Sequence, residues 1–537
     1  MPSRKAIVLS TLIVAVGCGT PSARPPTQSG PPFPGVLAEA EQPKPPSLDA
    51  ALREAAALIT PESSLRHLGV LAHDSMMGRD TDHPEIWTAA RYVAGRFESM
   101  GLEPMDADGD FIDEYPIVIP EMDATQVRLL MEREGEGLEL RAGRDFATPP
   151  AVSAPNFTGV TLAPVVGHDW YRTNPGRIPE GSLVLTHGPM MEMANITEAL
   201  RFGSWMENVL EAGANAVGMI LPPTVPAEMM GFLQEQLASS PSLHGPPMLM
   251  VPESTVEKIF EFAGLTAPLL EPLESIQHAP VAISFQMPVT TRTLTAPNVV
   301  ARLEGDGEGE LGAVVLTAHF DHEPPGLPTP EGDSILNGAD DNASGTVGLL
   351  EAAMAFSSLP DPPARSVVFA AVSAEEMGLL GSEWLAEHGP APASTTAANL
   401  NMDMLSRNGP DSLFVFGQTL STLGPVFRGV LANHPELGFR VRPGYQMPDL
   451  DLIRFSDQAS YLARGVPVLM FNSGFHPELH TADDEVELAD PDKLARAARL
   501  VFYLAYRVAD DPVDPAWTDE GRARTEAMQE RLMRTGG

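Results

Sequence analysis

Side chains of the kinds that bind metal ions recur at short intervals in the second half of this 537-residue chain. Five stretches carry them: AHFDH, GADDNASG, SAEEMG, NMDM and HTADD. The candidates in these stretches are His319, Asp321, Asp340, Asp341, Glu375, Glu376, Asp403 and His480. Zinc accepts imidazole nitrogen and carboxylate oxygen, and two zinc ions can share one bridging carboxylate. The residue types therefore predict a metal centre.

The adjacent aspartates Asp340 and Asp341 strengthen this prediction. They precede small and apolar residues that indicate the start of a buried helix. A helix N-terminus favours one anion, but two neighbouring buried carboxylates repel each other unless a strong cation lies between them. The remaining histidines His322, His434 and His476 are expected to be solvated or hydrogen-bonded residues, as lone histidines usually are. No G-x-S-x-G elbow is present, which argues against a serine hydrolase.

The segments before these candidates predict β-strands that end at them. From NVVARLEG onward, apolar runs are followed by polar turns and helices, a pattern typical of βαβ units. GAVVLTAHFDH, RSVVFAAVSAEE, AANLNMDM and VPVLMFNSG are the expected strands. Ligands in open α/β sheets gather at the carboxyl ends of the strands. We therefore expect an α/β fold, with a mixed, mostly parallel central sheet flanked by helices and a smaller inserted β/α unit.

Composition divides the chain into six expected segments. Arg4 and Lys5 precede a short apolar run, and Gly17 and Cys18 resemble the end of a bacterial lipoprotein signal, so residues 1–18 are expected to direct export and Cys18 to carry a lipid anchor. The other expected segments are a Pro-rich tether at 19–47, a first part of the main domain at 48–147, an insert at 148–286, the main domain at 287–510 and a charged tail at 511–537. The protein would then face the periplasm or the cell exterior.

Bulk composition limits the partners. The chain has 72 acidic and 34 basic residues, a net charge of -38, which disfavours nucleic acid and anionic membrane surfaces as partners. Contact with a membrane is therefore expected only through the lipid anchor. Cys18 is the single cysteine, so neither an internal disulfide nor a thiolate zinc site is possible.

In order and content, the motifs AHFDH, GADDNASG, AEEMGLLGS, NLNMDM and HTADD resemble the co-catalytic di-zinc aminopeptidases, whose relatives include glutamate carboxypeptidase and glutaminyl cyclase. The resemblance extends to LAHDSMMGRDT, and the middle region resembles a protease-associated (PA) domain. It implies a zinc-exopeptidase fold with two Zn²⁺. It also implies one zinc held by His319, Asp340 and Asp403 and a second held by Asp340, Glu376 and His480. Asp340 would then bridge the ions, and Asp341 would accept hydrogen bonds just outside the ligand shell.

The resemblance also implies two further roles. Glu375 would be the general base, because zinc lowers the pKa of a bound water to about 7 and a nearby carboxylate can pass its proton to the leaving amine. Asp321 would orient the ring of His319. One departure concerns Ser456, Asp457 and Gln458, where many relatives have Ser-Asp-His, so an outer-shell role of the third position is in doubt.

The expected activity is hydrolysis of N-terminal residues from peptides. A carboxypeptidase or dipeptidase on the same metal site is the alternative; it would need a cationic pocket for the substrate carboxylate. Candidates for that pocket are Arg407, Arg440, Arg442 and Arg454. A non-catalytic zinc-containing binding protein is a further alternative. The side-chain preference, protein partners and oligomeric state stay open.

Overall fold

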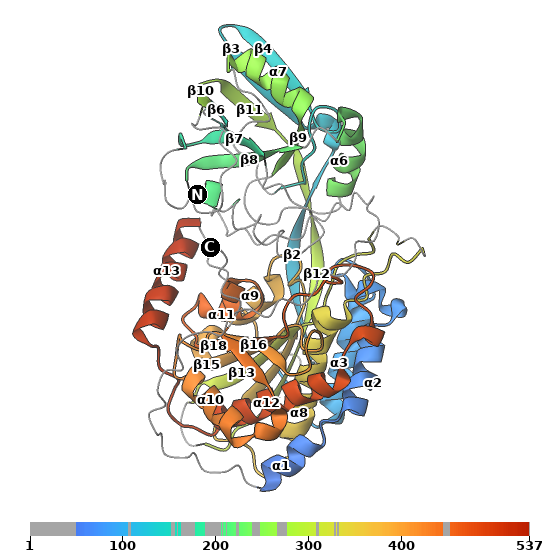
Figure 1. Cartoon of the computed structure of the whole chain (residues 1–537), viewed down its shortest axis with the longest axis vertical. Coiled ribbons are helices and arrows are strands. Elements are labelled where there is room, and N and C mark those ends of the chain that lie inside the picture. Colours follow the sequence, from blue (N-terminus) through green and yellow to red (C-terminus); the bar gives the residue numbers. More distant parts are fainter. Residues whose placement is uncertain are drawn as a thin grey trace.

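The computed structural model describes residues 50–535 with short gaps. The gaps are 106–108, 152–155, 158, 163–177, 188–205, 207, 211, 222–224, 239–247, 266–276, 308–310, 327–328, 330–331 and 444–451. The expected signal at 1–18, with Cys18, and the tether at 19–47 lie outside the described residues. The rest forms two bodies, a larger lower one and a smaller upper one (Figure 1).

A mixed nine-stranded sheet forms the centre of the larger body. Its strands run in the order β1-β12-β14-β13-β15-β18-β16-β17, with β2 paired to β12. The pairs β14-β13, β13-β15, β15-β18 and β16-β17 are parallel, and the others are antiparallel. The bounds are β1 Glu103–Pro104, β2 Ile112–Met122, β12 Val289–Leu303, β13 Ala313–His319, β14 Val367–Val372, β15 Thr396–Met402, β16 Ser412–Phe416, β17 Arg440–Pro443 and β18 Val468–Asn472. The predicted fold class is confirmed.

Helices cover both faces of this sheet. Strand β14 is buried along its whole length, as expected for a parallel strand with helices on each side. Alternate residues of β13 enter different cores, with Val314 and Leu316 on one face and Val315 on the other. The first face is covered by α1 Ala50–Ala57, α2 Pro61–Leu71, α3 Ile86–Ser99, α8 Gly345–Ser357, α10 Leu423–Asn433 and α12 Pro491–Ala509. The second is covered by α9 Leu380–Glu387 and α11 Gln458–Leu462.

The smaller body has its own hydrophobic core between two sheets. Five strands run in the order β10-β6-β7-β8-β9, and four in the order β4-β3-β11-β5. Their bounds are β3 Arg128–Arg133, β4 Glu136–Arg141, β5 Asn156–Phe157, β6 Gly159–Leu162, β7 Ser182–His187, β8 Ala214–Leu221, β9 Leu249–Pro252, β10 Gln277–Ala279 and β11 Ala282–Gln286. Helices α6 Met230–Ala238 and α7 Glu253–Ala263 pack beside them.

The boundary of the smaller body differs from the expected 148–286. Its core begins at Val127, because β3 pairs with both β4 and β11 and so belongs to this body. The long antiparallel pair of β2 and β12 runs from the larger body towards the smaller one (Figure 1). The insert is therefore entered and left through paired strands.

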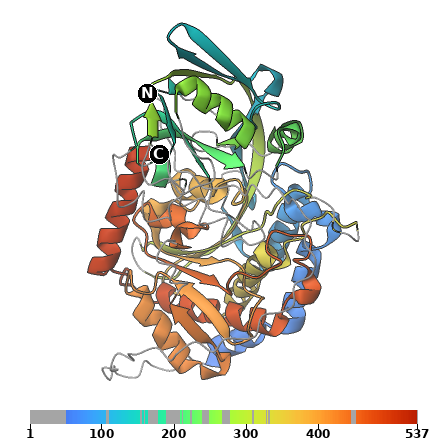
Figure 2. The same ribbon diagram turned by 45° about the horizontal axis from the view of Figure 1, so that its top comes forward.

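The chain end also differs from the expected charged tail. Residues Asp519–Thr535 form helix α13, which runs along one side of the larger body towards the smaller one (Figures 1 and 2). Thr518 donates its backbone N–H to the carbonyl of Leu420, and Gly521 packs so closely on the same carbonyl that a Cβ there would lie 1.8 Å away. Among the described helices, none combines the length and hydrophobicity that crossing a membrane requires.

Candidate metal centre

The carboxyl ends of three adjacent strands place most of the candidate ligands. His319 is the last residue of β13, Glu375 and Glu376 follow β14, and Asp403 follows β15. Because β14, β13 and β15 are neighbours in the sheet and parallel, these side chains arrive at one edge. The turn Ala339–Ser344 before α8 and the loop after β18, with His480, complete the site.

One group of ligand atoms consists of His319, Asp341 and Asp403, all buried and within 4.8 Å of one another. The Nε2 of His319 lies 3.4 Å from Oδ1 of Asp341 and 3.6 Å from Oδ1 of Asp403. That Asp403 oxygen is buried, and none of the described residues donates a hydrogen bond to it. Buried acceptors are nearly always satisfied, so an unpaired carboxylate oxygen facing an imidazole nitrogen fits a cation-binding position.

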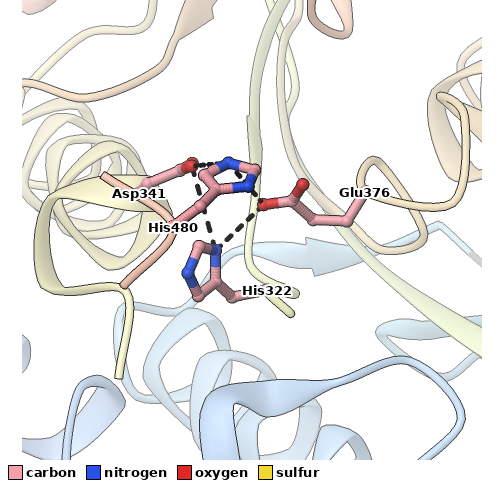
Figure 3. Close-up of side chains that lie close together, drawn as sticks. All are labelled: His322, Asp341, Glu376 and His480. Atoms are coloured by element: carbon pink, nitrogen blue, oxygen red, sulfur yellow. Dashed lines mark hydrogen bonds and ion pairs between the residues drawn. The ribbon is translucent and has the colours of Figure 1, made fainter. Parts of the chain in front are cut away.

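A second group consists of His322, Asp341, Glu376 and His480 (Figure 3). The Nε2 of His480 lies 2.9 Å from Oδ2 of Asp341 and 3.7 Å from Oε1 of Glu376. Asp341 therefore turns one oxygen to each group, which is the arrangement of a bridging carboxylate. The structure brings His319, Glu376, Asp403 and His480 together in these two groups, and their roles as ligands stay predictions.

The structure corrects the prediction for Asp340. Its Oδ1 accepts hydrogen bonds from the backbone N–H and hydroxyl of Ser406 at 2.6 and 2.7 Å, and its Oδ2 lies 3.4 Å from Nε2 of His476. Asp340 thus faces away from both groups, and Asp341 occupies the shared position. The backbone of this turn is non-helical at Asp341 and Asn342, and the two aspartate side chains contact different partners.

His322 is hydrogen-bonded, as one of the two expected possibilities. Its ring is buried, and its Nδ1 lies 2.9 Å from Oε1 of Glu376, so that it belongs to the second group. Its position directly after Asp321 in AHFDH was the available signal. His434 and His476 lie outside both groups of the described residues.

The pKa shifts at the site indicate that its buried carboxylates are not fully balanced by nearby positive charge. Burial raises the pKa of Glu375 and of Glu376 well above its usual range. Burial by itself would lower the pKa of His480, but the carboxylates around it, Glu376 first, raise it well above the usual value. Burial lowers the pKa of His322 to about 3, so this ring is neutral. Divalent cations would relieve the repulsion among these acids.

Asp321, expected to orient the ring of His319, lies next to that ring, and its carboxylate has additional contacts. The Nδ1 of His319 lies 3.3 Å from the backbone oxygen of Asp321 and 3.7 Å from its carboxylate. The carboxylate accepts the backbone N–H groups of Glu375 and Glu376 at 3.2 and 3.4 Å and the hydroxyl of Thr81 at 3.1 Å. Asp321 therefore positions the acidic turn after β14 as well as the imidazole.

Two buried groups support the site in a way that the sequence did not indicate. Asp484, the last residue of HTADD, accepts the backbone N–H groups of Asp340 and Asp341 at 3.0 and 3.1 Å. Arg407 donates to Asp484 at 3.2 Å and to Glu478 at 2.6 Å. The strand-end motifs contain Asp484, but nothing in them shows that its oxygen holds a backbone turn.

The doubtful position Gln458 has a structural role. Its amide oxygen accepts from the side chain of Asn401 at 2.8 Å, and its amide nitrogen donates to the carbonyl of Ile453 at 2.8 Å. Asn401 also donates to the hydroxyl of Ser456 at 2.8 Å. Gln458 therefore belongs to a buried amide network beside β15.

The fold and the site define an α/β protein with a candidate two-metal centre at the carboxyl edge of its sheet. Residues 298–505 match the model of Peptidase family M28.

Named relatives match parts of the chain. A probable leucine aminopeptidase of Arthroderma benhamiae is 28% identical over 189 residues, 34% of this chain and 50% of that protein. Aminopeptidase YwaD of Bacillus subtilis is 26% identical over 223 residues, 41% of this chain and 46% of that protein. The chain thus spans about half the length of the curated relatives it matches. The solved aminopeptidase from Aneurinibacillus sp. strain AM-1 is similar with a TM-score of 0.49 at 18% identity, covering 86% of this chain and 98% of that one.

Proposed function

We propose that this protein is a zinc-dependent exopeptidase, and specifically an aminopeptidase that removes N-terminal residues from peptides. The observation that carries the proposal is the pair of ligand groups that share Asp341. His319, Asp341 and Asp403 would hold one zinc ion, and Asp341, Glu376 and His480 the other. Imidazole and carboxylate donors suit zinc. When bound, the ions would supply Lewis acidity, which polarises a carbonyl and makes water a better nucleophile.

Glu375 is placed to handle the proton. It lies with His319 and Glu376 in a third group of neighbouring donor atoms, and it is only partly exposed. A general base works best when its pKa is close to the working pH, and burial raises the pKa of Glu375 in that direction. Glu375 would take the proton of the attacking water and deliver it to the amine that leaves when the peptide bond breaks.

The preference for the amino end rests on the charge around the site. A free amino terminus needs carboxylates, and the two groups are rich in them. A C-terminal carboxylate needs a cation that is free to bind it. Arg407, one candidate for that cation, is already engaged by Asp484 and Glu478 and is buried. Arg440 pairs with Asp411 at 2.9 Å and is largely exposed.

The remaining sequence predictions are part of this proposal. Cys18 would anchor the exported protein to a bacterial membrane, as supported by the signal-like residues before it. The smaller body would be a PA-like insert, as supported by its separate core.

Metal analysis and substrate choice test the proposal. Purified protein should contain two zinc ions, hydrolyse aminoacyl chromogenic substrates and lose this activity on chelation. Substrates with a blocked amino end and a free carboxyl end should be poor. The reverse preference would establish the carboxypeptidase alternative, and tight zinc binding without hydrolysis of either substrate type would establish a binding protein.

A further inference from the structure

The imidazole of His322 points into the second ligand group although the family motifs assign it no role. Its Nδ1 lies 2.9 Å from Oε1 of Glu376 and 3.8 Å from Oδ2 of Asp341. Its ring meets the ring of His480 edge-on, with centroids 5.3 Å apart. Figure 3 shows both imidazoles converging with the two carboxylates on one small space.

The surrounding chain holds this ring in place. His322 is 1% exposed, and its Nε2 is buried without a hydrogen-bond partner among the described residues. Gly338 packs against the ring, because an added Cβ there would lie 2.6 Å from two ring carbons. Within the described part of the chain, the polar contacts of the ring are at Nδ1. The fold therefore presents one nitrogen of His322 to the ligand group, at a fixed distance.

The four donor atoms have the spacing of a tetrahedral zinc site. Zinc bonds of about 2.0–2.1 Å place the donors of a tetrahedron roughly 3.3–3.4 Å apart. The four distances between a nitrogen and an oxygen are 2.9 and 3.8 Å from Nδ1 of His322, and 2.9 and 3.7 Å from Nε2 of His480; all four atoms lie within 4.8 Å of one another. They lie on both sides of the tetrahedral value. A hydrogen bond between His322 and Glu376 alone would not require Nδ1 to face Asp341 as well.

We propose that Nδ1 of His322 is a fourth protein ligand of the ion at the Asp341–Glu376–His480 group. This inference rests on the proposed zinc-dependent function and deepens it. It makes the two metal positions unequal: four protein donors are typical of closed, structural zinc sites, whereas three are typical of sites that keep a position open. The His319–Asp341–Asp403 group, with three donors, would then be the one that receives water and the substrate carbonyl.

Zinc X-ray absorption spectroscopy of the full chain loaded with two zinc ions tests this directly. With His322 as a ligand, three imidazoles are shared by two ions, about 1.5 per zinc, and without it the average is about 1.0. A value near 1.5 is expected, and a value near 1.0 overturns the inference. This measurement on the unaltered protein does not depend on the folding of any variant.

A variant supplies the second readout. His322→Gln should lower the affinity for one of the two zinc ions at least tenfold and weaken the visible absorption of the cobalt-substituted protein. His388→Gln, at an exposed histidine, should change neither. Unchanged cobalt absorption and imidazole count in a folded His322→Gln protein would refute the inference while leaving the proposed function intact. Failure of the unaltered protein to bind zinc would instead refute the proposed function itself.

Discussion

Asp340 and Asp341 are adjacent in the sequence, and exchanging each in turn for asparagine separates a bridging ligand from a supporting residue. Oδ1 and Oδ2 of Asp341 lie 3.4 and 2.9 Å from the imidazole nitrogens of His319 and His480, so Asp341→Asn removes negative charge from both ligand groups. Asp340→Asn changes a side chain that faces Ser406 and keeps an oxygen that can accept the same hydrogen bonds. The two substitutions are chemically identical, which makes each the control of the other.

The expected difference follows from zinc energetics. Structural zinc sites with four donors have apparent binding free energies of about 10–16 kcal/mol, so one donor accounts for roughly 3 kcal/mol, or about a hundredfold in affinity. Because Asp341 would be a ligand of both ions, Asp341→Asn should lower the affinity for each zinc ion about a hundredfold. Removing a residue that hydrogen-bonds to a metal ligand usually lowers the metal affinity about 10–100-fold. Asp340→Asn should lower the zinc affinity about tenfold or less, because asparagine keeps an oxygen that can accept the same hydrogen bonds.

Competition with a chromogenic chelator, followed by metal analysis of the dialysed proteins, measures both affinities. Asp340→Asn should retain two zinc ions under conditions in which Asp341→Asn has lost them. Circular dichroism should show both variants folded. If Asp341→Asn keeps both ions while Asp340→Asn loses them, the assignment of the bridge from this geometry is refuted and the original sequence assignment is restored.

Three further outcomes are expected. Glu375→Gln should retain zinc but lower kcat by about 10²–10⁴-fold, the usual contribution of a general base. The control Glu98→Gln, on an exposed helix surface, should leave kcat unchanged. Loss of zinc from the Glu375→Gln protein would contradict the assignment of Glu375 as the base. Asp484→Asn should lower the free energy of unfolding by about 1–3 kcal/mol and weaken zinc binding. One oxygen of Asp484 accepts two buried backbone N–H groups and the other accepts from Arg407, and asparagine keeps only one of these acceptors. Calorimetry and chelator competition test this, and an unchanged zinc affinity would count against it. Burial lowers the pKa of His67 to about 4, below its unfolded value near 6.5. Between these two pH values the unfolded chain binds more protons than the folded one. The free energy of unfolding should therefore fall by up to about 3 kcal/mol as the pH drops from about 6.5 to 4. In denaturant titrations the variant His67→Gln should lose that part of the pH dependence, and an identical slope in both proteins would disprove it.

The sequence predicted the parts of the site that depend on strand ends. His319 and Asp403 could be placed because apolar runs define the strands and parallel strands bring their carboxyl ends to one edge. Helix α12 was equally predictable from the sequence. Asp490 caps it by accepting the N–H of Lys493, and its apolar residues recur at helical spacing.

The parts that were mispredicted depend on the direction of single side chains. Asp340 and Asp341 are chemically identical neighbours, and which one faces the site is decided by a turn whose backbone angles no local pattern encodes. The start of the insert at Val127 was mispredicted for a related reason, since β3 can be assigned only through its long-range partner β11. Helix α13 lacks a strong apolar face, so its sequence indicated only a charged tail.

Arg79 shows how the early part of the chain contributes to a site whose ligands all come later. Its guanidinium is buried and donates to the backbone oxygens of Phe320, Asn337 and Gly338 at 2.7, 2.7 and 3.0 Å. These contacts join the loop after His319 to the turn before Asp341, so one side chain links the segments that carry these two candidate ligands.

Arg79 also brings positive charge behind the carboxylates without blocking the space between them. Burial lowers its pKa to about 10, against the opposing effect of nearby acids, Asp321 first, so it stays charged at neutral pH. Five N–H donors in a rigid plane suit Arg for binding several carbonyl oxygens at once, and Lys cannot reproduce that pattern. A buried cation that binds backbone rather than carboxylate leaves the acids free for metal ions, and it therefore favours a site that is preformed before the ions arrive.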